Sequence, residues 1–272
     1  MASMNNFRVT QKKRESYFEM ESSHVHDFHE IYYLVGGMRR YFINDSIYTI
    51  NKGDVVVILK GMIHRTSYNN EKTHERMDCK FRTEFLNADA KLLKEFEEAF
   101  ASEPVISLAP AQREHLLQIL KNIRAEYESP DDMSDINARA LIQSLMVFLI
   151  RLKRLQKSPV GFDPDDSLMQ EAARYIRANY AAPLTLDGIA AHVNTSPTYF
   201  SKKFKRATGF GCREYLVNVR LQEATKMLLQ TNLSITDIAL ECGFNSSNYF
   251  GDVFRRVNGV SPAVYRKNNK LS

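Results

Sequence analysis

The first quarter of the chain contains histidines and carboxylates, whose side chains can hold a ligand. His24 and His26 are two residues apart, so in a strand they face the same side. Imidazole nitrogens with one carboxylate suit Fe, Mn, Ni or Zn, and the same groups can instead bind a polar metabolite by hydrogen bonds. A third interpretation is a structural core role. All three stay open, and we favour the metal-free pocket.

The last third of the chain contains an internal duplication. The segment 184–190 matches 233–239 at an offset of 49 residues, and beyond a one-residue slip the match continues at an offset of 50. The later pairs are Tyr199-Phe200 with Tyr249-Phe250, Phe204 with Phe254, Gly209 with Gly259, and Tyr215 with Tyr265. Two similar units therefore follow each other.

Each copy has the pattern of a helix-turn-helix. Thr185 and Ser234 stand where a helix N-cap is expected, and Asn194 and Gly243 suit a turn with left-handed backbone. Between the copies, Cys212–Gln230 has a helical pattern without Gly or Pro. Such a helix spans about 28 Å, which approaches the ~34 Å between successive major-groove faces of DNA.

Charge separates this part from the rest. Of the formal charge of +5, residues 167–272 contribute 14 Lys/Arg against 7 Asp/Glu, whereas the preceding 166 residues hold 23 against 25. A basic module on a mildly acidic body indicates a polyanion-binding unit attached to another domain. Together with the duplication, this predicts DNA binding.

Residues 168–267 resemble the DNA-binding domain of the AraC/XylS family of bacterial transcription regulators. The resemblance rests on residues 235–244, Tyr249-Phe250, 254–256, 259–262 and Tyr265-Arg266, and on the matching positions of the first copy. It implies that the second helix of each copy enters the major groove. Lys203, Arg206, Arg256 and Arg266 are expected to contact phosphates or water. The implied outward, DNA-reading residues are Thr198, Ser201, Lys202, Lys205, Ser247, Asn248, Gly251, Asp252 and Arg255.

Two residues of the second copy depart from that family pattern. Gly251 and Asp252 replace the larger polar or basic residues that are usual there. Asp252 repels phosphate or, alternatively, accepts from a cytosine amino group. The second copy is therefore expected to read fewer bases than the first, unless Asp252 makes that cytosine contact.

The elements that must position the histidine cluster are β-strands. Residues 15–83 hold short apolar or alternating runs at 30–35, 40–43, 47–50 and 54–59, separated by turn signals at 36–37, 44–45 and 51–53. This spacing predicts a sandwich or barrel. From about residue 87 the period becomes helical, and we predict helices over 88–101, 112–127 and 134–157.

Residues 24–64 resemble a cupin, the ligand-binding barrel that is joined to this DNA-binding domain in many family members. His24-Val25-His26, Glu30 and Gly37 match the first cupin motif, and Gly53-Asp54, Gly61 and His64 the second, except at Leu59 and Tyr68. In metal-binding cupins the corresponding set, here His24, His26, Glu30 and His64, ligates one cation. In the interpretation that we favour, the protein requires no cofactor. The expected effector-binding residues are His24, His26, Glu30, Tyr32, Arg39, Tyr41 and His64.

The third predicted helix also has the spacing of a short coiled coil. The seam assigned to homodimerisation consists of Leu141, Leu145, Phe148, Leu152 and Leu155, with burial inside its own domain as the alternative. The residues after it are rich in turn formers. We therefore divide the chain into a sensor and dimerisation domain (1–157), a linker (158–167) and a DNA-binding domain (168–272).

The resulting prediction is an α+β multidomain protein: an N-terminal cupin-like β-barrel with a helical dimerisation segment and a C-terminal all-α double helix-turn-helix. We expect a bacterial transcription regulator that works in the cytoplasm and is not an enzyme. We predict that it activates transcription. We expect it to bind promoter DNA, RNA polymerase and a sugar-like effector, and not to bind a membrane. The polar N-terminus and three scattered cysteines fit that compartment. The rivals are a metal-dependent cupin enzyme, such as a dioxygenase or isomerase, and a regulator without an effector.

Overall fold

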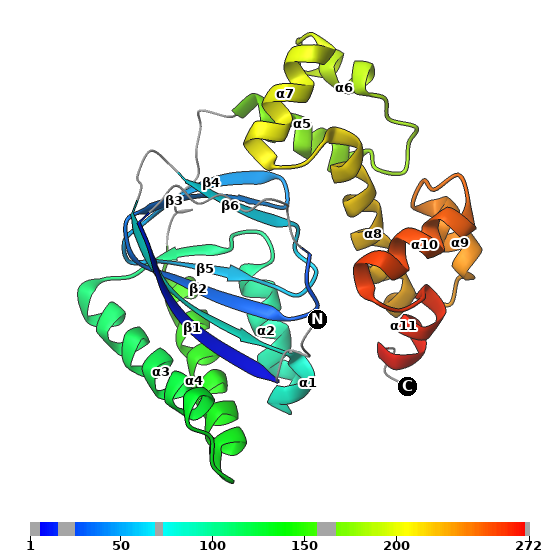
Figure 1. The fold of residues 1–272 in the computed structure, drawn as a ribbon. Helices are drawn as coiled ribbons and strands as arrows, with labels where there is room; N and C mark the ends of the chain where they lie inside the picture. The colour runs from blue at the N-terminus through cyan, green and yellow to red at the C-terminus, as the bar shows by residue number, and fades with distance from the viewer. Residues whose placement is uncertain (1–5, 16–24, 69–72, 157–166, 270–272) are drawn as a thin grey trace.

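The computed structural model describes residues 6–15, 25–68, 73–156 and 167–269. Within them the chain forms an N-terminal part built from strands and helices and a C-terminal part that is all helical, so the fold is α+β with two domains (Figure 1). We call these parts the sensor and the DNA-binding unit. No described helix is long and apolar enough to cross a membrane. The predicted linker, apart from Ser167, lies outside the described residues.

Two sheets that face each other form the sensor (Figure 1). The larger sheet has the order β1-β7-β2-β5-β8 and the smaller one β4-β3-β6, and every strand pair is antiparallel. Their bounds are β1 Phe7–Arg14, β2 His29–Gly36, β3 Met38–Ile43, β4 Ser46–Asn51, β5 Asp54–Ile58, β6 His64–Tyr68, β7 His74–Phe81 and β8 Val105–Ser107.

Helices cover the outer face of the larger sheet. They are α1 (Thr83–Leu86), α2 (Ala90–Phe100), α3 (Pro110–Glu128) and α4 (Ser134–Leu155). Alternation along β2 sends Ile31 and Tyr33 to this helix-covered face and Glu30 and Tyr32 to the space between the sheets. Because both faces are covered, even the polar residues of β2 are buried.

Most strands and helices of the sensor are where the sequence predicts them, and two strands are not. The predicted β region begins at residue 15, yet β1 already runs over Phe7–Arg14 and pairs with β7. Its polar, basic sequence is that of an edge strand, which has solvent on one side. β8, only three residues long, lies inside the region predicted as helical.

The predicted dimerisation seam on α4 needs a correction. Leu145 is fully buried in the core of its own domain, where α4 packs against α2 and α3. Leu141, Phe148 and Leu152 are half-buried against the same core, and Leu155 is exposed. Leu145 therefore cannot contact a second copy while this packing is intact, whereas the role of Leu141, Phe148, Leu152 and Leu155 in dimerisation stays a prediction.

Over residues 167–269 the DNA-binding unit forms seven helices. They are α5 (Ser167–Ala178), α6 (Leu186–His192), α7 (Pro197–Thr208), α8 (Cys212–Gln230), α9 (Ile235–Glu241), α10 (Ser247–Asn258) and α11 (Pro262–Asn269). The two predicted helix-turn-helix units are α6–α7 and α9–α10, and α8 connects them with the predicted bounds (Figure 1).

Local hydrogen bonds explain why both units begin and turn where they do. The hydroxyls of Thr185 and Ser234 accept from backbone N–H groups in the first turns of α6 and α9, as predicted for N-caps. Asn194 and Gly243 have positive φ angles of 53° and 79° at the two turns. At Gly243 a Cβ would lie 2.6 Å from the carbonyl oxygen of Ala181, so only glycine fits.

Candidate effector site and nucleic-acid interface

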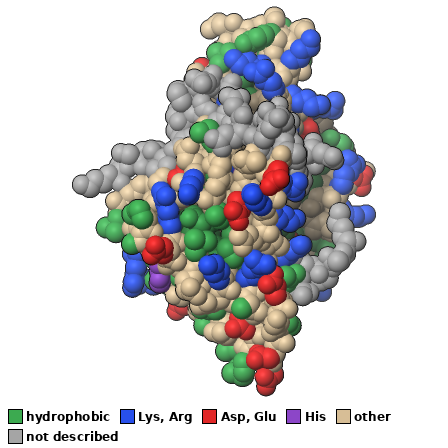
Figure 2. Space-filling view, turned by 60° about the vertical axis from the view of Figure 1, so that its left-hand side comes forward, with side chains coloured by type: hydrophobic (Ala, Val, Ile, Leu, Met, Phe, Trp, Pro, Cys, Tyr) green, Lys and Arg blue, Asp and Glu red, His purple; other side chains and the backbone are tan. Residues whose placement is uncertain are grey.

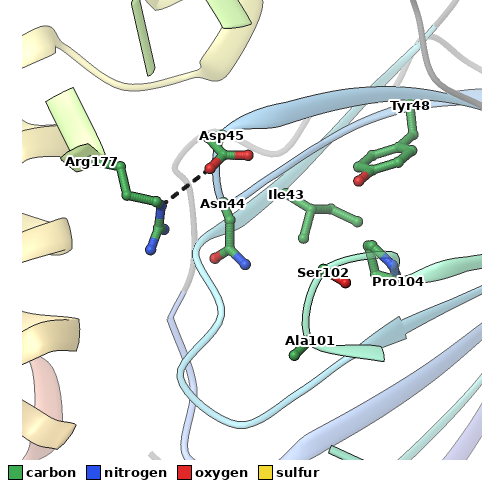
Figure 3. Close-up of a pocket in the computed structure, with 8 residues that line it drawn as sticks. All are labelled: Ile43, Asn44, Asp45, Tyr48, Ala101, Ser102, Pro104 and Arg177. Carbon is green, nitrogen blue, oxygen red and sulfur yellow. Dashed lines mark ion pairs between the residues drawn. The ribbon is translucent and has the colours of Figure 1, made fainter. Parts of the chain in front are cut away.

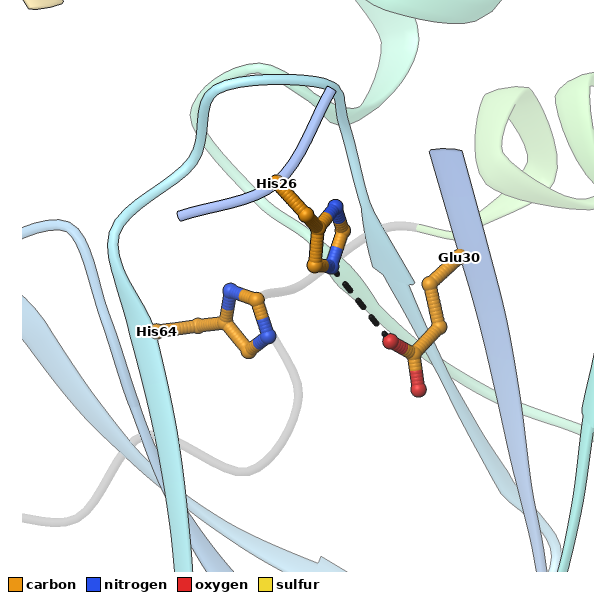
Figure 4. A group of neighbouring side chains, drawn as sticks. All are labelled: His26, Glu30 and His64. Atoms are coloured by element: carbon orange, nitrogen blue, oxygen red, sulfur yellow. Dashed lines mark ion pairs between the residues drawn. The ribbon is translucent and has the colours of Figure 1, made fainter. Parts of the chain in front are cut away.

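His26, Glu30 and His64 converge between the two sheets (Figure 4). His26 precedes β2, Glu30 belongs to β2 and His64 begins β6, and their ligand atoms all lie within 4.8 Å of one another. The His26 Nε2 atom is 3.4 Å from Glu30 Oε2. The fourth predicted member, His24, lies outside the described residues.

A row of charged side chains on β7 borders this cluster. Arg76, Asp78 and Lys80 alternate with apolar residues, so they share the inner face with Glu30, and Lys80 Nζ lies 3.2 Å from Glu30 Oε2. Arg76 forms an ion pair of 2.9 Å with Asp78. Burial would raise the pKa of Glu30, but the contact with His26 and the charge of Lys80 outweigh it and hold that pKa well below its usual range. Glu30 is therefore ionised.

The smaller sheet supplies polar groups from the other side. Arg39 on β3 is fully buried, and its Nη2 donates to Thr66 Oγ1 on β6 at 3.2 Å. Tyr41 packs edge-on against Tyr32 of the facing sheet, with ring centroids 5.2 Å apart. The predicted residues Tyr32, Arg39 and Tyr41 thus meet in the sensor interior, although the sequence could only place them by strand position.

Among the residues that the structure describes, two buried polar atoms of this interior make no hydrogen bond of good geometry: His26 Nε2, beside Glu30, and Tyr32 Oη, beside Tyr41. The 3.4 Å approach of His26 to Glu30 is an electrostatic contact without hydrogen-bond geometry. Buried polar atoms are normally satisfied, because leaving one unpaired costs about 1–3 kcal/mol. These two atoms therefore mark places where a bound molecule can donate or accept.

The structure adds four residues that sequence reasoning missed. These are Thr66, Arg76, Asp78 and Lys80. The available signal was the alternation of polar residues with Met77, Cys79 and Phe81, which predicts a strand with one polar and one buried face. Its pairing with β2, which brings Lys80 opposite Glu30, is a long-range register that the sequence does not display.

The spacing of His26, Glu30 and His64 would allow one metal ion to be shared among them. The charge around them argues against it. Glu30, the only carboxylate of the three, already has the ammonium of Lys80 at 3.2 Å and the guanidinium of Arg76 at 4.0 Å. Those cations repel a metal at the same oxygen atoms. The set fits hydrogen bonding to a ligand better than metal coordination.

The predicted DNA-reading residues lie along one side of α7 and α10. Thr198, Ser201, Lys202 and Lys205 are exposed on α7, and so are Asn248, Asp252 and Arg255 on α10, whereas Ser247 and Gly251 are half-buried. Phe200, Phe204, Phe250 and Phe254 fix the opposite sides of the two helices in the core. On the face seen in Figure 2, Lys and Arg side chains gather at the upper end, the height at which Figure 1 places α7.

Three more side chains bear on the predicted DNA interface. Arg266, assigned to phosphate, donates through Nε to the Leu228 carbonyl at 3.1 Å and is half-buried, so it braces α11 against α8. Tyr199 and Tyr249 occupy equivalent positions near the starts of α7 and α10 and are 50% and 47% exposed. The repeated Tyr-Phe pair was visible in the sequence, but its division into one exposed and one buried ring was not predicted.

A cavity of about 220 Å³ lies where the sensor meets α5 (Figure 3). Its walls come from the β3–β4 turn, the segment before β8, and Arg177 of α5. Arg177 extends from α5 toward Asp45, with 3.4 Å between Nε and Oδ2. Residues of both domains therefore line the cavity.

Comparison with known families places the chain. Residues 9–146 match the family described as the AraC-like ligand binding domain, and residues 189–268 match a helix-turn-helix domain family. The chain therefore belongs to the AraC family: it is a DNA-binding transcription regulator with a ligand-binding domain.

Several individual proteins are similar to it. The transcriptional activator RhaR of Escherichia coli is 28% identical over 250 residues, which cover 91% of this chain and 88% of RhaR. The C-terminal domain of AraT from Geobacillus stearothermophilus is 33% identical over 39% of this chain and 88% of its own, with a TM-score of 0.37. Fatty-acid-bound ToxT from Vibrio cholerae is 15% identical over 98% of both chains, with a TM-score of 0.40.

Proposed function

We propose that this regulator binds promoter DNA through α7 and α10 and is controlled by a small, hydroxyl-rich metabolite held between the two sheets of the sensor. The observation that supports the effector is a pair of buried polar atoms, His26 Nε2 and Tyr32 Oη, which make no hydrogen bond of good geometry within the described chain. They lie amid the polar groups of Glu30, Arg39 and Lys80. A sugar offers several hydroxyls, each able to donate and accept, and a face that packs on tyrosine rings.

The regulator acts in this proposal without catalysis and without a metal. The crowding of Lys80 and Arg76 around Glu30 supports that view. We further propose that it works in the cytoplasm as a homodimer and activates transcription through contact with RNA polymerase. Because Leu145 is buried, the dimer contact would use the exposed end of α4 at Leu155 and the half-buried residues beside it.

DNA binding is tested by fluorescence anisotropy on the upstream DNA of its own gene and on a scrambled duplex at two salt concentrations. We expect tighter binding to the upstream DNA and a steep loss of affinity with salt. Lys202→Ala should weaken binding, whereas Lys226→Ala, an exposed lysine on α8, is the matched control. Equal affinity for both duplexes would contradict sequence-specific recognition.

The effector is tested by thermal unfolding with a panel of sugars and sugar acids. A ligand that binds only the folded state at one hundred times its Kd stabilises it by about 2.7 kcal/mol. Tyr32→Phe should abolish that shift, and Tyr33→Phe, on the opposite face of β2, should keep it. Metal analysis and titration with Mn²⁺, Ni²⁺ and Zn²⁺ address the alternative: stoichiometric binding lost in His64→Ala would favour a metal site.

A further inference from the structure

The DNA-binding unit docks on the smaller sheet of the sensor through a shared apolar core. Phe42, Ile47 and Ile63 of the sensor are buried in the same cluster as the core of the first helix-turn-helix unit. The ring of Phe42 lies 5.7 Å from that of Tyr215 on α8, centroid to centroid. The contact is therefore continuous with the folded interior of both domains.

Polar contacts fix the same interface. Tyr215 Oη donates to the Asn44 carbonyl at 2.7 Å, and Gln222 Nε2, also on α8, donates to the Gly61 carbonyl at 2.5 Å. Gln222 Oε1 accepts from Arg177 at 2.9 Å. The sensor side of these contacts consists of two short segments, residues 42–47 and 61–64, which we call the junction turns.

The junction turns also contain a residue of the candidate effector site. His64 stands three positions after Gly61, and its Nδ1 lies 3.0 Å from the Met62 carbonyl. The two turns are joined by a hydrogen bond from Asn44 N to the Ile63 carbonyl at 2.8 Å and by the pairing of Ile43 with His64. Only Met62 and Ile63 thus separate the imidazole of the candidate effector site from the carbonyl that holds α8.

The second helix-turn-helix unit stands apart from this interface. Among the described residues, its buried core contains side chains of the DNA-binding unit and none of the sensor. Because α8 carries it, its position relative to the sensor depends on how the sensor holds Tyr215 and Gln222. The junction turns therefore hold the first unit directly and the second through α8.

We propose that the junction turns are a latch that transmits occupancy of the effector site to α8, with His64 and Gln222 as its two ends. A ligand that shifts the His64 ring shifts residues 61–64 and with them the Gly61 carbonyl bonded to Gln222. The ligand thereby changes the relative stability of docked and released DNA-binding units, which is the differential contact that any allosteric effect requires. This inference rests on the proposed function and adds the route by which the site is coupled to DNA.

A double-mutant cycle tests the latch without knowledge of the effector. The dissociation constant for upstream DNA is measured by anisotropy for the full chain, His64→Gln, Gln222→Ala and the double variant. We expect His64→Gln to change it by about fivefold alone and by less than about twofold in the Gln222→Ala background. His115→Gln on α3 and Gln230→Ala at the end of α8 are the matched controls. Equal fold-changes in both backgrounds would overturn the latch.

A cross-linking experiment tests it independently of DNA. The side chains of Asp45 in the sensor and Arg177 on α5 approach to 3.4 Å, so cysteines at these two positions, which leave Gln222 in place, should be bridged by a short thiol-reactive cross-linker. The native cysteines are buried. We expect adding His64→Gln to slow the bridging about fivefold, while a Gln118→Cys, Asn122→Cys pair on α3 reacts unchanged. An unchanged cross-linking rate for the Asp45–Arg177 pair would contradict the latch. Absence of specific DNA binding in every variant, with the cross-link result intact, instead sinks the proposed function.

Discussion

The two helix-turn-helix units share one backbone plan and differ in their surfaces. In both, a seven-residue helix is followed by a twelve-residue recognition helix, which begins after a capping serine and ends at a glycine with positive φ. The recognition helix α7 carries four basic residues at 202, 203, 205 and 206, whereas α10 carries Asp252 with Arg255 and Arg256. The two units therefore share the pattern of their buried residues and differ in the exposed residues of α7 and α10.

Their surroundings differ as well. The first unit is buried against the sensor through Phe42, Ile47 and Ile63, while the second is attached through α8. The core of the first unit is therefore shared with the sensor, whereas the buried core of the second is formed by helices of the DNA-binding unit. One copy of the motif thus packs against the sensor, and the other is held near the C-terminal end of α8.

The largest expected effect distinguishes the turns of the two units. Gly243→Val forces a side chain into positive φ and against the Ala181 carbonyl, and should destabilise the protein by about 4 kcal/mol. Asn194→Gly, at the equivalent turn, should stay within about 0.5 kcal/mol, because asparagine already adopts that backbone. Denaturant unfolding measures both. Similar losses would show that the two turns are under the same constraint.

The next effect concerns the sensor on which the first unit docks. Burial and the charge of Lys60 lower the pKa of His29 from 6.5 to about 4, because its ring is enclosed beside Phe96 and Thr83. The neutral imidazole is favoured by folding, so this stability is complete above pH 6.5 and is lost as the pH falls from 6.5 through 4. The loss amounts to about 3 kcal/mol.

Denaturant titrations between pH 7 and pH 4 should therefore show a steeper decline for the native chain than for His29→Gln. Amide exchange adds the comparison: at pH 4.5, α7 should lose protection before α10, because only α7 belongs to the core that the sensor shares. If the free energy of unfolding fell equally steeply with pH in the native chain and in His29→Gln, His29 would not be the source of the acid sensitivity.

A smaller effect separates the two recognition helices on DNA. Lys202→Ala should weaken binding to upstream DNA about thirtyfold, and Asn248→Ala about fivefold, because the second helix presents fewer long polar side chains. The measurement is anisotropy on upstream and scrambled duplexes, with Lys203→Ala as a control expected to weaken both equally. A larger loss of affinity from Asn248→Ala than from Lys202→Ala would contradict the prediction that the second unit reads fewer bases than the first.

The smallest effect concerns Asp252, the acidic residue exposed on α10. Asp252→Lys should strengthen binding to any duplex by about fivefold and steepen the salt dependence by about one unit of slope, because it replaces repulsion of phosphate by attraction. Asp135→Lys on α4 makes the same charge change away from α10. If Asp252→Lys weakened binding to upstream DNA only, Asp252 would be reading a cytosine.

The sequence predicted the local elements well and the long-range contacts poorly. The duplication, the caps at Thr185 and Ser234, and α8 all follow from neighbouring residues, and they are confirmed. The pairing of β1 with β7 was missed because Phe7–Arg14 is polar at an edge. Local pattern also could not distinguish a dimer seam from an internal one at Leu145, since both use the same apolar spacing.

The candidate site shows the same division. His26, Glu30 and His64 were predicted from a motif, and the structure brings them together. Arg76, Asp78 and Lys80 enter through a strand register between residues about 50 positions apart. The docking contacts of Gln222 and Tyr215 are also not predictable locally, because their partners are backbone carbonyls, which every residue has.

The uninterrupted helix α8 has a consequence for the DNA itself. A helix without Gly or Pro keeps the two recognition helices at a fixed separation and rotation. B-DNA turns by about 34–36° for each base pair, so one base pair inserted between the two contacted segments rotates one of them out of phase, and five place it on the opposite face. The regulator should therefore tolerate base changes between its contacts far better than changes in their spacing.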